Sequence, residues 1–389
     1  MEKILSLTHT NPLIDSRILK TSAVIESLEI PFCVIGINRG KFLSPNRENF
    51  VAIDVVTKRR VQLFQKKISK LKTLKRMLSL IVFLEIFLKL FLKGVFFKPT
   101  VIHVNDCYVL PIAALIRVFT RSRILYDAHE LESETNGISA NMRRVVNFIE
   151  KSCWNSVDVL VTVSPSIQSW YIQKLGSKSS SIVLNSPHFN VKNIRRQYED
   201  YFREKYNLSK ESRIFLYLGN LERGRGIETI LEAFLNTPKD RVIIFMGSGS
   251  LENKISKFTK NNSNIFLHAP VSHDIVVNVA SSADFGICLI EDISLSDRFC
   301  LPNKLFEYIF SGLPVIASNL PDMRKLILEY DVGICIENST QSLLRAVLET
   351  DKDQFDDLAF QHDMLNDLSW ESQAQKLESI YRELLAVPK

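Results

Sequence analysis

Residues 301–323 read LPNKLFEYIFSGLPVIASNLPDM, a short helical pattern that leads through a glycine into an apolar strand. Pro302 predicts the first helical turn, and Gly312 predicts the end of the helix. The run LPVIAS that follows is typical of a strand buried on both faces. A helix between two such strands is the repeating unit of a parallel sheet, so this stretch predicts an α/β fold.

Strands and helices alternate throughout the chain in the same way. The expected strands are residues 4–7, 32–37, 50–56, 101–106, 123–130, 157–164 and 181–187 in the first half, and 213–220, 241–247, 264–269, 280–290 and 313–318 in the second. Continuous apolar strands predict parallel sheets that helices cover on both faces. The length of 389 residues exceeds what one core usually organises.

We therefore predict two doubly wound, Rossmann-like domains that face a central cleft. Residues 1–190 form the first and residues 191–370 the second, and residues 371–389 form a helix that packs back on the first. Ligands of such sheets bind at the carboxyl ends of the strands, which places the expected site in the cleft.

Positive charge is concentrated in one segment. Residues 58–98 hold twelve Lys or Arg and one acid, which gives +11 in a chain whose net charge is +6. Apolar residues alternate with these lysines and then dominate the second part of the segment. Charges inside the apolar run disfavour a spanning helix, so we expect a basic amphipathic element on an anionic membrane surface. The alternative is a helix pair on the first domain with a solvated basic side.

Cysteine usage and the N-terminus bear on the compartment. Six cysteines occur without a CxxC pair, mostly in apolar runs, which favours buried thiols in a reducing compartment over disulfides or a zinc site. The first residues, MEKILSLTHTNP, lack the long apolar core of a signal peptide. We expect a cytoplasmic protein, peripheral on the inner face of the cytoplasmic membrane. The basic segment lacks a recognised nucleic-acid-binding pattern, so no nucleic-acid partner is expected.

Two charged residues stand out in the opening helix. The helix N-terminus and Lys304 favour an anion at the cleft. Glu307 lies three residues further on the same face and would repel phosphate, but it can accept two hydrogen bonds from a vicinal diol such as that of ribose. The pair therefore indicates a nucleotide site, and the alternative is an ordinary surface ion pair.

The run LPNKLFEYIFSGLPVIASNLP resembles the signature helix of retaining family 4 glycosyltransferases, which have the GT-B fold. Glu307 matches the second glutamate of the E-x7-E motif of that family. Phe299 stands where the first glutamate is expected, a departure that resembles a bacterial surface-polysaccharide subgroup with PNKxxEY. The resemblance implies that backbone amides of Cys300 and Leu301, with Asn303, take over contacts to the donor sugar.

The resemblance covers nearly the whole chain. The stretch LYLGNLERGRGIETILEAF matches the strand, loop and helix that carry the diphosphate clamp of the family. Arg225 falls at the clamp lysine, Gly219 lies in the loop, and Asn220 replaces the usual arginine. Arg223 or Lys304 would then compensate. Solvation of the loop is the alternative reading of Arg223 and Arg225. The motif MGSGS (246–250) is a weak signal for a loop near the base.

In the first half, YDAHELESE matches the family segment with a histidine at a strand end, which implies that His129 faces the donor sugar. The loop NPLIDSR replaces the glycine-rich first loop of the family. Asp15, Arg17 and Asp106 lie at strand ends where they could contact acceptor or phosphate. The alternative for Asp15 is a cap on the following helix, and the alternative for Asp106 is that it simply closes a turn.

The function implied is transfer of a sugar, with retention of configuration, from a nucleotide-sugar to a membrane-associated glycan such as lipopolysaccharide, capsule or a lipid-linked oligosaccharide. Arg225, Lys304 and the helix N-terminus would stabilise the leaving diphosphate, and His129 would orient the donor. The resemblance implies a reaction that needs no metal or other cofactor. Two alternatives remain: a UDP-sugar epimerase of the same fold, and an inactive GT-B scaffold at the membrane.

Overall fold

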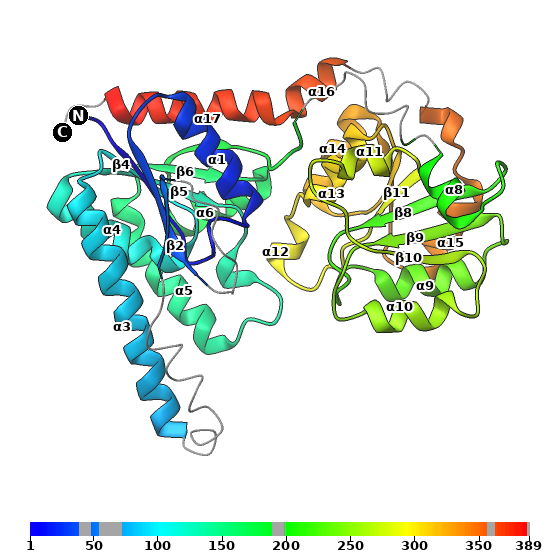
Figure 1. Cartoon of the computed structure of the whole chain (residues 1–389), viewed down its shortest axis with the longest axis horizontal. Helices are drawn as coiled ribbons and strands as arrows, with labels where there is room; N and C mark the ends of the chain where they lie inside the picture. Colours follow the sequence, from blue (N-terminus) through cyan, green and yellow to red (C-terminus); the bar gives the residue numbers. More distant parts are fainter. Residues whose placement is uncertain (39–47, 54–71, 189–197, 199, 356–361, 387–389) are drawn as a thin grey trace.

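The computed structural model describes residues 1–38, 48–53, 72–188, 198, 200–355 and 362–386. This part of the chain forms two entirely parallel sheets, each flanked by helices (Figure 1). The first has the strand order β3-β2-β1-β4-β5-β6-β7 and the second β10-β9-β8-β11-β12-β13. The prediction of two Rossmann-like sheets is confirmed.

The first sheet has short, mostly buried strands: β1 (Ile4–Leu7), β2 (Phe32–Ile37), β3 (Phe50–Ile53), β4 (Val101–Val104), β5 (Arg123–Ala128), β6 (Val159–Thr162) and β7 (Ser179–Ile182). One face packs on α3 (Lys72–Phe97), α4 (Leu110–Thr120), α5 (Ala140–Cys153) and α6 (Pro165–Leu175). The opposite face packs on α1 (Ser16–Ser27) and the C-terminal helix α17 (Trp370–Ala386). Single turns of 3-10 helix are η1 (Cys107–Val109), η2 (Glu132–Glu134) and η3 (Trp154–Ser156).

The second sheet comprises β8 (Arg213–Leu218), β9 (Arg241–Met246), β10 (Ile265–His268), β11 (Phe285–Cys288), β12 (Val315–Ser318) and β13 (Gly333–Ile336). One face carries α11 (Val276–Ala280), α13 (Asn303–Phe310), α14 (Pro321–Tyr330) and α16 (His362–Leu368), with α8 (Tyr201–Tyr206) beside them. The other carries α9 (Ile227–Leu235), α10 (Glu252–Thr259) and α15 (Thr340–Glu349). The short α12 (Leu295–Arg298) lies between β11 and α13.

Both sheets reverse their strand order once, between β1 and β4 and between β8 and β11. Connections leave the sheet in opposite directions at such a point, so a crevice opens outside the carboxyl ends of these strands. The loops after β1, β4, β8 and β11 therefore form the walls of the cleft between the two sheets.

The C-terminal helix α17 returns to the first sheet after the second sheet is complete (Figure 1). Its side chains Trp370, Leu377 and Tyr381 are buried in the core that α1 also covers. The last strand of the first sheet ends at Ile182 and the first strand of the second begins at Arg213. The predicted boundary between residues 190 and 191 falls among residues that lie outside the described part.

The opening helix differs in one detail from the prediction. Pro302 is the N-cap of α13 rather than its first helical residue, with φ −73° and ψ 145°, so the helix starts at Asn303. Of the basic segment 58–98, residues 72–98 are described, and 72–97 form the single helix α3. Within the described residues, no helix combines the length and the apolar character needed to span a bilayer.

Candidate functional site

The loop after β8 is shaped by glycines. Gly219, Gly224 and Gly226 have φ values of 111°, 81° and 69°, which residues with a Cβ rarely adopt. The hydroxyl of Tyr217, at the end of β8, donates to the carbonyl of Asn220 (2.8 Å) and ties the loop to the sheet. The loop therefore has a defined backbone path at the carboxyl end of a central strand.

The motif MGSGS (246–250) is in close contact with the loop after β8. A Cβ on Gly247 would lie 1.9 Å from the Gly219 carbonyl oxygen, and one on Gly249 would lie 2.5 Å from that of Leu221. The Leu221 amide donates to the Ser248 carbonyl at 2.9 Å. These glycines are needed for contact between two loops, so their pattern has a structural explanation without a ligand.

Lys304 lies under the same loop. It is 7% exposed, and its Nζ sits 4.0 Å from the centre of the Tyr217 ring. Within the described residues, no carboxylate pairs with it. A cation–π contact thus holds a buried ammonium group next to the loop. The alternative of a solvated surface pair with Glu307 is wrong for this residue.

Glu307 points into a pocket between the two halves of the chain. The pocket has a volume of about 660 Å³ and is lined by Ser16 and Lys20 of α1, Asn185, Pro187, His188, His273, Asp274, Val276, Val277, Asn278, Asn303, Glu307 and Glu371. Burial raises the pKa of Glu307, and the charges of His273, Lys20 and Lys304 oppose the rise in part. Among the described residues, none donates a hydrogen bond to its carboxylate.

Lys20 and His273 face Glu307 in this pocket and were not predicted from the sequence. The Nζ of Lys20 donates to the Ser186 carbonyl (2.7 Å) and to Asn185 Oδ1 (3.2 Å). Burial lowers its pKa to about 8, and the charge of Glu307 opposes this. Both residues reach the pocket only through the packing of elements far apart in the sequence.

Arg225 is partly exposed, and its guanidinium lies 3.5 Å from the carboxylate of Asp297. Asp297 belongs to α12, where it accepts a hydrogen bond from the Ser294 hydroxyl (2.7 Å). Ser294 caps α12 by accepting from the Asp297 amide (3.0 Å). Sequence reasoning missed Asp297, although the spacing S-x-x-D is a helix-start signal.

The other residues predicted on this wall differ in exposure. Asn220, Arg223 and Asn303 are exposed, whereas Leu301 is buried. The amide of Cys300 is directed at the Asp297 carbonyl at 3.4 Å, so that bond closes the α12 turn. Its predicted contact with the donor sugar remains a prediction.

Phe299, which stands at the expected position of a glutamate, lies at the contact between the two halves. Its side chain packs on the core of the first domain, and its carbonyl accepts from the Ser164 hydroxyl (2.7 Å). An aromatic side chain here therefore stabilises the arrangement of the domains around the cleft.

His129 directly follows β5 on the opposite wall. It lines a pocket of about 180 Å³ that includes Asp15, Asn105, Asp106, Glu130 and Glu132. The Nδ1 atom of His129 is buried and has no hydrogen-bond partner among the described residues. Burial and the charges of Glu130 and Asp106 raise the pKa of Glu132 to about 7. This pocket thus combines an unpaired imidazole nitrogen with a carboxyl group that titrates near neutrality.

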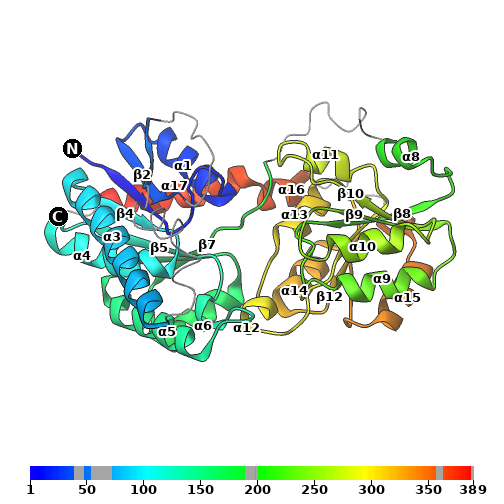
Figure 2. The same cartoon turned by 60° about the horizontal axis from the view of Figure 1, so that its bottom comes forward.

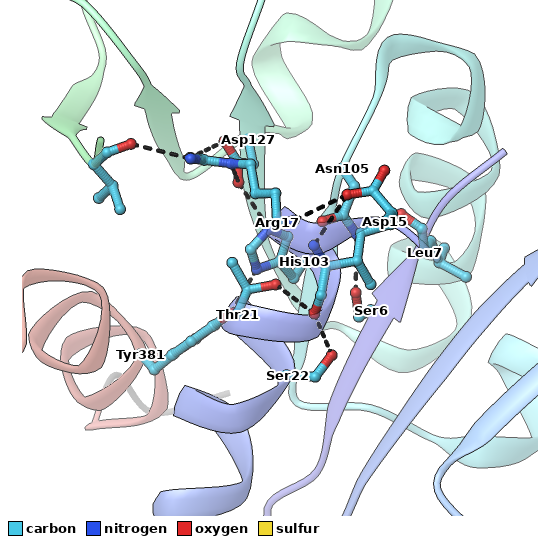
Figure 3. A network of polar contacts seen from close by, with 12 residues as sticks. Ser6, Leu7, Asp15, Arg17, Thr21, Ser22, His103, Asn105, Asp127 and Tyr381 are labelled. Atoms are coloured by element: carbon cyan, nitrogen blue, oxygen red, sulfur yellow. Dashed lines mark hydrogen bonds and ion pairs between the residues drawn. The ribbon is translucent and has the colours of Figure 1, made fainter. Parts of the chain in front are cut away.

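Arg17 extends to Asp127 within the first domain (Figure 3), and it also lines the His129 pocket. It is 4% exposed, and its guanidinium donates to both oxygens of Asp127 (2.7 and 2.8 Å) and to the Val183 carbonyl (3.1 Å). Burial alone would raise the pKa of Asp127, but Arg17 and His103 hold it well below its usual range. The geometry gives Arg17 a structural role, and its contact with acceptor or phosphate stays a prediction.

Asp15 and Asp106 are engaged in local caps. Asp15 Oδ1 accepts from the amides of Arg17 (3.1 Å) and Ile18 (3.2 Å) and caps α1. Asp106 Oδ1 accepts from the amides of Tyr108 and Val109, and its Oδ2 accepts from the His9 amide (2.8 Å). The capping interpretations of both residues agree with these contacts, although both also line the His129 pocket.

Comparison with known proteins finds a family match within the second domain. Residues 199–364 match the family model described as Glycosyl transferases group 1. Lipopolysaccharide 1,2-N-acetylglucosaminetransferase of Salmonella typhimurium is 21% identical over 235 residues, which are 56% of this chain and 60% of that protein. The alignment therefore spans less than two thirds of the relative.

Solved structures resemble the whole chain in fold. Sucrose-phosphate synthase from Thermosynechococcus elongatus superposes with a TM-score of 0.75 at 16% identity, over 99% of this chain and 100% of that one. Anabaena HepE in complex with UDP-glucose gives 0.74 at 13% identity, over 98% and 100%. At these identities the likeness establishes the fold, which is the two-domain GT-B architecture.

Proposed function

We propose that this chain is a retaining glycosyltransferase that uses a nucleotide-sugar donor. The observation that carries the proposal is Glu307: a mostly enclosed carboxylate in the pocket between the domains, without a hydrogen bond from the described residues. A carboxylate at such a position can accept from both hydroxyls of a ribose. Glu307 belongs to the domain that matches a glycosyltransferase family. HepE, which has the same fold, was solved in complex with UDP-glucose.

Lys304 and Arg225 would bind the diphosphate of the donor. Lys304 is held beside the glycine loop without a carboxylate partner in the described part, and α13 begins next to it. The guanidinium of Arg225 lies 3.5 Å from the carboxylate of Asp297. A phosphate group of the donor could displace that carboxylate from Arg225. Preorganised cations of this kind stabilise the charge that develops on the leaving diphosphate.

The reaction would break the bond between the anomeric carbon and the diphosphate oxygen and form a bond to the acceptor hydroxyl on the same face. The departing phosphate would accept the proton of that hydroxyl, so no protein carboxylate is needed as a base. His129, with an unpaired Nδ1, would orient the donor sugar across the cleft. This scheme involves neither a metal nor another cofactor.

The acceptor is proposed to be a glycan carried by a membrane lipid or lipopolysaccharide. The relative from Salmonella is named for action on lipopolysaccharide. The basic segment 58–98 would hold the enzyme on the inner face of the cytoplasmic membrane, where it would meet such an acceptor. Nucleic acid is not among the proposed partners.

Replacement of Glu307 tests the proposal. Glu307→Gln removes a charged acceptor for two hydroxyls, so affinity for UDP or another nucleoside diphosphate should fall roughly tenfold to a hundredfold, or about 1.5–3 kcal/mol. Calorimetry with a panel of nucleoside diphosphates measures this. Glu371→Gln is the matched control, because Glu371 lines the same pocket and lies 2.9 Å from His188.

Affinity and donor turnover of the Glu307 variant within twofold of the unmodified protein would overturn the assignment. Product analysis separates the alternatives. A transferase forms a glycosylated acceptor, an epimerase releases a free sugar of changed configuration, and a scaffold does not consume the donor at all.

A further inference from the structure

Exposed apolar side chains are concentrated on three helices of the first domain. Fourteen of the twenty exposed large hydrophobic residues in the described part lie on α3, α4 and α5. We call these the outer apolar layer: Met77, Leu80, Ile81, Phe83, Leu84, Leu88, Leu92 and Phe96 on α3; Leu115, Val118 and Phe119 on α4; and Met142, Val145 and Phe148 on α5. Soluble domains rarely expose so many large apolar side chains on adjacent elements.

Helix α3 presents apolar side chains in two directions. Leu90 is fully buried, and a Cβ on Gly94 would lie 2.3 Å from Ile116 Cδ1, so α3 approaches α4 closely on its inner side. Leu84 and Leu88, at four-residue spacing, are each 54% exposed on another side. Packing against the domain therefore explains only one of the two apolar faces.

The three helices form one continuous sheet-covering layer. α3 packs on α4, α4 packs on α5, and all three cover the same core. The rings of Phe91 on α3 and Phe119 on α4 are 5.6 Å apart in an edge-to-face contact. Figure 2 shows the three helices together on the outside of the first domain. The exposed residues of α4 and α5 thus extend the surface that α3 begins.

The exposed charges of this layer are all positive in the described part. Lys93, Lys98, Arg121, Arg143, Arg144 and Lys151 are exposed on or directly after these helices. Of the acids on the same helices, Glu85 lies 2.6 Å from Lys89 and Glu150 is buried. Arg143 lies 3.7 Å from Glu134 of η2, whereas no ion pair is formed by Lys93, Lys98, Arg121, Arg144 or Lys151 within the described residues. The surface therefore combines aromatic and aliphatic side chains with an excess of positive charge.

We propose that the outer apolar layer docks on an anionic lipid bilayer, with α3 lying in the plane of the headgroups. This inference rests on the proposed membrane-borne acceptor, and it extends the contact beyond segment 58–98 to α4 and α5. Large apolar side chains enter the headgroup region while lysines and arginines contact anionic lipid. A second copy of the chain is a poorer partner, because it would bring the same positive charges together. The 26 residues of α3 make it about 39 Å long.

Vesicle flotation of the full chain tests the proposal. The unmodified protein should bind vesicles of phosphatidylcholine with phosphatidylglycerol at low salt, and bind pure phosphatidylcholine weakly. Two variants, Leu84→Asp with Leu88→Asp on α3 and Val118→Asp with Phe148→Asp on α4 and α5, should each lower partitioning roughly tenfold or more. The matched control is Leu328→Asp with Leu348→Asp on the second domain, 61% and 43% exposed before substitution, which should bind as the unmodified protein does.

Three results would overturn the proposal. They are failure of the unmodified protein to float with anionic vesicles, equal binding to neutral vesicles, and undiminished binding of the α4 and α5 variant. Sedimentation without vesicles tests whether a second copy of the chain covers the layer instead. A dimer that these substitutions dissociate would overturn the proposal in favour of that second copy. Nucleoside diphosphate binding in solution reports on the proposed function separately, and it should be unchanged in all three variants. The Glu307→Gln protein should still float.

Discussion

The two walls of the cleft treat their charged residues differently. On the first domain, Arg17, Asp15 and Asp106 are engaged in hydrogen bonds to Asp127 and to backbone amides. On the second domain, Lys304 is held by an aromatic ring, and the Glu307 carboxylate receives no hydrogen bond from the described residues. Arg17, Asp15 and Asp106 are thus satisfied within the first domain, whereas Lys304 and Glu307 have no salt-bridge or hydrogen-bonding partner among the described residues.

This difference separates structural from functional charge. Buried charges that are fully paired stabilise a fold only as long as both partners remain. Charges fixed by packing but lacking polar partners lower stability unless a ligand satisfies them, which makes them candidates for binding. The comparison therefore predicts that changes on the first wall affect folding and changes on the second affect turnover.

The largest effect is expected at Arg17. Arg17→Met leaves the buried Asp127 without the two hydrogen bonds of its arginine partner and with His103 at 3.4 Å, which should lower the free energy of unfolding by about 3–5 kcal/mol. Urea unfolding followed by circular dichroism measures this. Arg17→Met with Asp127→Asn should recover much of the loss, because the unpaired charge is gone. A Met variant as stable as the original protein but unable to use its donor would reverse the comparison.

Lys304 should show the opposite behaviour. Lys304→Met retains an unbranched side chain over Tyr217 but removes the charge, so kcat should fall by roughly 10²–10³ with no loss of stability against unfolding. Steady-state kinetics measures this, with nucleotide-sugars of the nucleoside diphosphate that binds most tightly in the panel. Arg225→Met should act in the same direction. Unchanged affinity of both variants for nucleoside diphosphate would exclude them as the clamp.

Glu132 lies on the first wall but, unlike Arg17, Asp15 and Asp106, it is a partly buried carboxyl group whose charged form burial destabilises. Its pKa is raised to about 7 from the 4.5 of a free glutamate, so the folded protein binds more protons than the unfolded chain between these values. The free energy of unfolding should therefore decrease as pH rises from about 4.5 to 7, by about 1–3 kcal/mol from this group. Unfolding midpoints of Glu132→Gln and the original protein, compared across this range, should converge at low pH. Parallel curves would contradict the shift.

Asp15 is expected to give the smallest effect. Asp15→Ala removes the N-cap of α1 and should cost about 1 kcal/mol of stability. Ser139→Ala is the matched control, because Ser139 caps α5 by accepting from the Met142 amide (3.2 Å). Thermal unfolding compares the two. If only the Asp15 variant also loses donor turnover, Asp15 contacts a substrate in addition to capping the helix.

Much of the fold could be predicted from local patterns. Buried parallel strands are continuous apolar runs, and Gly312 and Ser164 mark helix ends, so the alternation of elements was readable in both halves. Boundaries were less accurate, as at Pro302, because capping depends on backbone angles that the residue type only biases. The exposed apolar residues of α4 and α5 form one surface with those of α3 only because the three helices pack side by side, which the sequence does not show.

The candidate site could be predicted only in part, because several of its residues come together only when distant elements pack. Glu307 and Lys304 could be predicted as candidates because one short helix carries both, and the matched family model includes that helix. Arg17 was assigned to the cleft since it follows a strand end, but its direction depends on Asp127, which is 110 residues away. Asp297, Lys20 and His273 gave no comparable signal, because each becomes part of the cleft through contacts with distant elements.

The sequence by itself determined the α/β class, the two sheets, the glycine loop and the helix that carries Lys304 and Glu307. These depend on periodicity and on backbone preferences within some twenty residues. Only the tertiary structure decided which charges are paired, since pairing depends on distances between segments that the chain brings together from far apart. It placed Arg17 against Asp127, Lys304 over Tyr217 and Glu307 opposite Lys20. Burial then removes water from these groups, so partners that a linear reading cannot see determine their charge and their availability.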